Sequence, residues 1–113
     1  MPELLIDQKT FADLIEMVGA DFIGELLETF FEEAPRSISQ MHQALDQGDA
    51  EAFRREAHSL KSNSASFGAH KLAALARELE FMGRDGNLAG AQEKLEKLES
   101  EYQQAQQALR GMA

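Results

Sequence analysis

The chain has 113 residues, which suffices for one domain with a hydrophobic core and is too short for two. Its net charge of −9 argues against nucleic-acid binding, and the absence of cysteine excludes disulfides and thiolate metal sites. The N-terminus lacks the basic start and apolar run of a signal peptide, and no stretch approaches the length of a membrane span. We therefore expect residues 1–113 to form a single cytoplasmic domain that binds neither nucleic acid nor membrane.

Apolar residues recur at helical spacing along the whole chain, and the breakers between them predict six helices. Asp7 can cap a first helix that ends at Gly19, and a second helix begins near Asp21. Pro35 is predicted to end that second helix and to stand in the first turn of a third, which runs to Gly48.

Three longer helical patterns fill the second half of the chain. Asp49 can cap a fourth helix that continues to Phe67 and ends at Gly68; the fifth ends around residues 83–86, and Asn87 can open the sixth. No run shows the alternation of a strand. The prediction is an all-α fold: an antiparallel up-and-down four-helix bundle of the second, fourth, fifth and sixth helices, with short accessory N-terminal helices.

The predicted fourth helix places a histidine, His58, outside the core. At about 100° per residue, one arc of the helix is mainly apolar, and a second arc is mainly polar and includes small side chains. The first arc contains Phe53, Ala57, Leu60, Ser64 and Phe67; the second contains Arg54, His58, Lys61, Ser62 and Ala65. Two cations beside His58 favour a neutral, nucleophilic imidazole and would stabilise an anion attached to it. The small side chains nearby would let a partner approach, so this arc suits the acceptance of phosphate.

The other two histidines carry no such pattern. His42 stands on a short predicted helix without a cationic residue in reach, and His70 stands at a helix start. A histidine on a helix surface usually has no chemical role, and we interpret His42 and His70 in that way.

The segment AHSLKSNSASFGAHKLAALARELE, residues 57–80, closely resembles the signature of the histidine-containing phosphotransfer (HPt) domain. That pattern is approximately A-H-x-L-K-G-x-S-x-x-x-G-A, followed by an apolar helix that ends in L-E. The matching positions are Ala57, His58, Leu60, Lys61, Ser64, Gly68, Ala69, Leu72, Leu79 and Glu80. One position departs, since Ser62 replaces the usual glycine; its hydroxyl could hydrogen-bond a phosphoryl oxygen.

The resemblance implies a phosphoryl carrier in a multistep two-component phosphorelay, without kinase machinery of its own. His58 would accept a phosphoryl group from a receiver-domain phospho-aspartate and pass it to another receiver, while Lys61 neutralises charge. The supporting residues would be Arg54, Ser62, Ser64 and Gly68. The implied partners are response-regulator receiver domains and a hybrid sensor histidine kinase. The protein itself would be a monomer without cofactor or metal, and Mg²⁺ would reside on the receiver. The sequence agrees in having no Walker-type loop and no G-x-G-x-x-G motif.

Two other classes of protein are open from the residues alone. A di-iron bundle needs Glu-x-x-His pairs, but Ser39, Arg55 and Phe67 stand three residues before the histidines. A plain acidic adaptor, binding partners without chemistry, explains everything except the motif. Within the family, the chain could be the phosphoacceptor domain of a chemotaxis kinase. The terminal Met1 and the end at Ala113 favour a free-standing protein.

Overall fold

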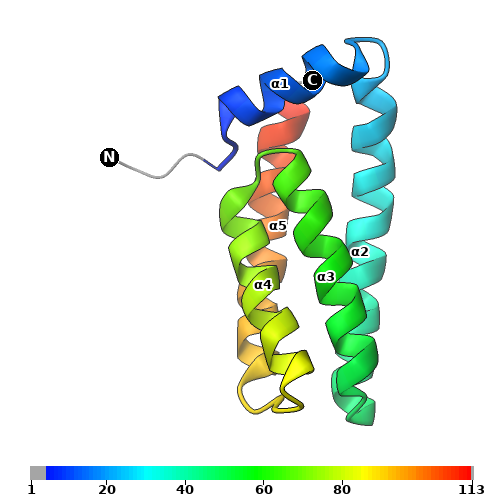
Figure 1. The fold of residues 1–113 in the computed structure, drawn as a ribbon, viewed down its shortest axis with the longest axis vertical. Helices are drawn as coiled ribbons and strands as arrows, with labels where there is room; N and C mark the ends of the chain where they lie inside the picture. Colours follow the sequence, from blue (N-terminus) through cyan, green and yellow to red (C-terminus); the bar gives the residue numbers. More distant parts are fainter. Residues whose placement is uncertain (1–4, 113) are drawn as a thin grey trace.

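The computed structural model describes residues 5–112, which form five helices and no strand (Figure 1). Their bounds are Gln8–Val18 for α1, Ile23–Gln47 for α2, Ala50–Ser66 for α3, His70–Arg84 for α4 and Ala91–Met112 for α5. Helices α2 to α5 alternate in direction as an up-and-down bundle, and α1 lies across one end of it (Figure 1). The predicted all-α bundle is confirmed, with one accessory helix within the described residues.

The prediction that Pro35 separates two helices is wrong, because α2 runs through it as one helix of 25 residues. A proline inside a helix removes a backbone hydrogen bond and costs about 3 kcal/mol. The apolar stripe continues on both sides of it, with Phe30, Ala34, Ile38 and Met41 all buried. Since Pro35 itself is exposed, its ring does not interrupt this packing, and the burial of the continuous stripe outweighs the lost bond.

The predicted caps at the starts of α1 and α3 are confirmed. Asp7 accepts hydrogen bonds from the backbone of Lys9 and Thr10, and Asp49 accepts one from the backbone of Ala52. The predicted start of the last helix is too early, since α5 begins at Ala91. Asn87 lies in the turn before α5, where its side chain accepts a hydrogen bond from the backbone of Ala89.

Helices α3 and α4 form a closely packed hairpin that carries the polar arc of α3. All five residues of the predicted apolar arc of α3 are buried. Near the open end of the hairpin, Gly83 of α4 lies against α3. A Cβ atom added there would come within 3.0 Å of the Arg54 backbone and of the Ala50 carbonyl oxygen. This close approach fixes the two helices relative to each other. None of the described helices is long and apolar enough to cross a membrane.

Candidate functional site

His58 lies near the middle of α3, on the side that faces away from the core. Its side chain is 55% exposed, whereas its neighbour Ala57 is completely buried. The predicted position of the imidazole outside the core is therefore confirmed. Lys61 follows one turn later and is less exposed than a free surface lysine, at 30%.

A carboxylate from the neighbouring helix joins these two side chains. Glu80 of α4 places its Oε2 atom 2.7 Å from His58 Nδ1, and its Oε1 atom lies 2.7 Å from Lys61 Nζ. The Glu80 side chain is only 12% exposed, so the contacts form at the mouth of the α3–α4 seam and not in bulk solvent. Glu80 thereby holds the imidazole and the ammonium on one short stretch of surface.

The charge of Glu80 decides which nitrogen of His58 carries the proton. Burial alone would raise the pKa of Glu80, but contacts with Lys61 and His58 outweigh it and hold the pKa below its ordinary value of 4.5. The carboxylate is therefore ionised near neutral pH and can only accept hydrogen bonds. His58 must donate from Nδ1, which leaves the lone pair of a neutral ring on Nε2. Within residues 5–112, no hydrogen bond engages that Nε2 atom.

The remaining predicted site residues do not all converge on His58. Arg54 pairs with Glu51, with 2.6 Å between its Nη2 atom and Oε1, and its supporting role at His58 stays a prediction. Ser62 is exposed one turn beyond His58, as expected. Ser64 is completely buried, as its place on the apolar arc predicts, and its supporting role stays a prediction. It belongs to the packed interior, because its position on the helix faces the core.

Gly68 serves the fold at a distance from the imidazole. It has φ +85°, a left-handed conformation that favours glycine, and it ends α3 with backbone bonds from Gly68 to Ala65 and from Ala69 to Ser64. Its carbonyl also accepts a hydrogen bond of 2.8 Å from the Asp7 backbone. An added Cβ would lie 2.8 Å from the Asp7 carbonyl oxygen. Gly68 therefore permits the turn and the docking of the segment before α1.

The other two histidines also contact carboxylates, but neither belongs to a group of histidine, carboxylate and lysine like that of His58, Glu80 and Lys61. His42 Nε2 lies 3.0 Å from Glu99 Oε1, and His70 Nε2 lies 3.3 Å from Asp7 Oδ2. Among the ion pairs of residues 5–112, a lysine shares the histidine's carboxylate only at His58. This difference supports His58, and not His42 or His70, as the candidate reactive histidine.

The role of Glu80 was missed from the sequence, although a signal for it was present. In a hairpin of two antiparallel helices, residues that are equally far in sequence from the turn lie opposite each other. His58 stands 11 residues before Ala69, and Glu80 stands 11 residues after it. Ala69 lies in the turn between α3 and α4, so the spacing places the carboxylate opposite the imidazole.

The part of the chain that the structure describes contains no group of three or more His, Cys, Asp or Glu residues that could hold a metal ion. The side chains gathered around His58 are its exposed imidazole and the Lys61 ammonium, joined by the Glu80 carboxylate.

The sequence matches the family described as Hpt domain over residues 25–108, which includes α3, α4 and most of α2 and α5. The chain belongs to the Hpt domain family. The phosphorelay protein LuxU of Vibrio vulnificus is 31% identical over 104 residues, covering 92% of this chain and 90% of that protein. Histidine-containing phosphotransfer protein 2 of Arabidopsis thaliana is 30% identical over 112 residues, covering 96% of this chain and 72% of that protein.

Solved structures agree with this assignment. The crystal structure of histidine-containing phosphotransfer protein B (HptB) from Pseudomonas aeruginosa PAO1 matches with a TM-score of 0.91 and 32% identity, over 98% of this chain and 96% of that one. The maize histidine-containing phosphotransfer protein ZmHP2 matches with a TM-score of 0.82 and 27% identity, over 96% and 88%. Membership of the Hpt domain family assigns histidine phosphotransfer in a phosphorelay to this chain, and favours it over the adaptor and di-iron alternatives.

Proposed function

We propose that this Hpt domain carries phosphoryl groups between receiver domains and that Nε2 of His58 is the atom that bears them. One observation supports this choice above the others: Nδ1 of an exposed His58 contacts the ionised carboxylate of Glu80 at 2.7 Å. The contact directs the proton to Nδ1 and leaves the nucleophilic lone pair on Nε2.

The transfer step follows from this tautomer. Nε2 attacks the phosphorus of a receiver's aspartyl phosphate; the N–P bond forms as the P–O bond breaks, and the aspartate carboxylate leaves. The imidazole gains positive charge during the attack, while its Nδ1 proton stays in place. Glu80 accepts the hydrogen bond from that proton and offsets the new charge. The same step in reverse delivers the phosphoryl group to an aspartate of a second receiver.

Lys61 and Ser62 act on the phosphoryl group and not on the ring. The Lys61 ammonium, one helical turn from His58, reduces the negative charge that gathers between the two proteins. Glu80 keeps it in place through the contact of 2.7 Å. The short Ser62 side chain is exposed on the same arc, and it leaves room for the aspartyl phosphate to approach.

The protein in this proposal is a carrier without kinase activity, and it acts as a monomer. Its partners are response-regulator receiver domains and a hybrid sensor histidine kinase, and Mg²⁺ belongs to the receivers. Membership of the Hpt domain family supports these classes of partner, as do relatives named for phosphorelay and phosphotransfer.

Transfer from two donors tests the proposal. The purified protein is incubated with radiolabelled ATP alone, or with Mg²⁺ and receiver domains phosphorylated in advance. We expect no label from ATP, and label from a cognate phospho-receiver within seconds, stable to alkali and labile to acid. Label from ATP alone would contradict the carrier function. Failure with every receiver encoded in the same genome would favour the adaptor alternative.

A further inference from the structure

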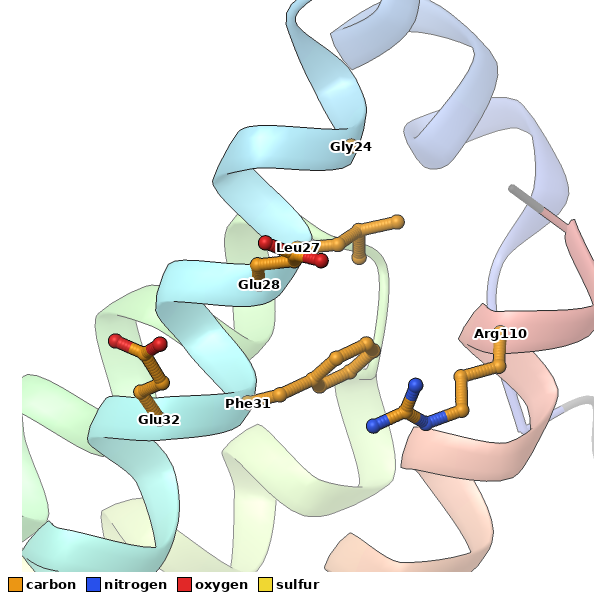
Figure 2. A pocket seen from close by; sticks show the side chains of 6 residues that line it. All are labelled: Gly24, Leu27, Glu28, Phe31, Glu32 and Arg110. Carbon is orange, nitrogen blue, oxygen red and sulfur yellow. The ribbon is translucent and has the colours of Figure 1, made fainter.

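A hollow of about 540 Å³ lies between α2 and α5 (Figure 2). We call it the α2–α5 groove; it is lined by Gly24, Leu27, Glu28, Phe31, Glu32 and Arg110. The His58–Glu80 contact belongs to the α3–α4 seam, which is formed by the other two helices of the bundle. The groove is therefore lined by helices other than the two that carry the His58–Glu80 contact.

The floor of the α2–α5 groove already holds a cation. Leu27 and Phe31 point across the gap from α2, and Arg110 reaches toward them from α5 (Figure 2). The guanidinium carbon of Arg110 lies 4.6 Å from the centre of the Phe31 ring. An arginine over an aromatic face at this distance is attracted by the ring. The face of the Phe31 ring is thus covered by the chain's own arginine.

Charge at this end of the bundle favours a basic partner. Between residues 5 and 35 the sequence has eight acidic residues and one lysine, whereas residues 36–113 have eleven acidic and ten basic residues. Residues 5–35, with eight acidic residues and one lysine, therefore carry −7 of the net charge of −9. Glu28 and Glu32 are exposed beside the hollow and belong to this acidic region. A basic segment would be drawn to it and would find the partly exposed ring of Phe31 there.

We propose that the α2–α5 groove docks a basic, amphipathic helical segment of a partner protein. An arginine of that segment stacks on Phe31 in place of Arg110, an apolar side chain fills the hollow beside Leu27, and flanking basic side chains pair with Glu28 and Glu32. This surface is separate from phosphoryl transfer, so a partner can hold the carrier while a receiver uses His58.

Gly24 provides a blocking variant that leaves every charge in place. It lies in α2 beside the hollow, and a Cβ added to it meets nothing within 4 Å. Gly24→Phe should fill the groove without loss of helix stability, because phenylalanine is a better helix former than glycine. Gly24→Ala is the matched control, since it adds a single carbon.

The probe is a fluorescein-labelled helical peptide with arginine and leucine on one face, compared with a scrambled peptide of the same composition at about 0.15 M salt, where distant charges are screened. We expect wild type and Gly24→Ala to bind the amphipathic peptide equally, and Gly24→Phe to bind it at least tenfold more weakly. Arg110→Ala should bind it more tightly, because the ring of Phe31 is freed. Equal binding by Gly24→Phe, or unchanged binding by Arg110→Ala, would overturn the proposal.

Two further comparisons separate docking from general attraction to an acidic protein. Glu28→Gln with Glu32→Gln should weaken binding, while Asp13→Asn with Glu16→Gln, which removes two exposed charges of α1, should change it little. Equal losses in both double variants, or equal binding of the scrambled peptide, would show attraction without a site. Saturating peptide should leave transfer to His58 unchanged; inhibition would contradict the separate surface.

Discussion

The Nδ1 atom of His58 and the Oε2 atom of Glu80 lie 2.7 Å apart across the seam of α3 and α4. The two residues belong to different helices, so the close packing of the hairpin maintains the contact. The same carboxylate also contacts the Lys61 ammonium. In the proposed transfer Glu80 is thus a positioning residue, which acts through the imidazole and the lysine.

Glu80→Gln should slow phosphoryl transfer to His58 by roughly 5- to 10-fold, as expected when a charge-assisted hydrogen bond of about 1.5–3 kcal/mol becomes a neutral one of about 0.5–1.5 kcal/mol. The amide preserves shape, so thermal unfolding should change little. Nitrogen NMR shifts of the His58 ring provide a second measurement. The wild-type ring should show a proton on Nδ1, and the variant a mixture of tautomers. A variant with wild-type transfer rates and the same tautomer would show that Glu80 does not position the ring.

Lys61→Ala should slow transfer roughly fivefold, in line with about 1 kcal/mol for a partly exposed charge. It should also raise the pKa of Glu80, because the ammonium no longer offsets the burial of the carboxylate. Carbon NMR titration of the Glu80 carboxyl group measures this shift, and Lys61→Arg is the control that retains the charge. Unchanged transfer by the alanine variant would show that the ammonium does not act on the phosphoryl group.

Ser62→Gly should transfer phosphate about as well as wild type, at a cost of about 0.5 kcal/mol or less in helix stability. Ser62→Gln should transfer far more slowly, since a long side chain one turn from His58 obstructs the approaching receiver. Ser59→Gln adds the same side chain about 100° around the helix from His58 and is the control. Circular dichroism should find similar helix content in all three. If Ser62→Gln and Ser62→Gly transfer at equal rates, the receiver does not approach across this turn.

Gly68→Ala should destabilise the fold more than Gly48→Ala does. Both glycines have positive φ, +85° and +68°, so both variants bear a left-handed alanine, which costs about 1–2 kcal/mol. Only at Gly68 does the new Cβ meet backbone, 2.8 Å from the Asp7 carbonyl oxygen. That contact should cost about 1–3 kcal/mol more. Denaturant unfolding measures the free energy of unfolding of both variants. Equal losses would show that the segment before α1 moves away from the new Cβ without destabilising the fold.

The sequence was sufficient to predict the core face of α3 and the exposure of His58, because both follow from helical periodicity alone. It was insufficient at Pro35, where local preference indicates a helix end. The apolar stripe of α2 packs on both sides of this residue, and that tertiary burial outweighs the local rule.

The electrostatics around His58 could be predicted only in part. Two cations on its own helix suggested a positively charged surrounding, but Arg54 pairs with Glu51 and the nearest charge on His58 is Glu80. A single-helix projection does not show a neighbouring helix. The equal spacing of His58 and Glu80 about Ala69 shows it once the hairpin is known.

The position of the phosphoryl group after transfer from a phosphorylated receiver decides whether His58 is the acceptor. Three variants, His58→Gln, His42→Gln and His70→Gln, are compared with wild type under the same conditions. We expect one acid-labile, alkali-stable phosphoryl group on wild type, His42→Gln and His70→Gln, and none on His58→Gln. Label that persists on His58→Gln, folded as wild type by circular dichroism, would contradict this assignment.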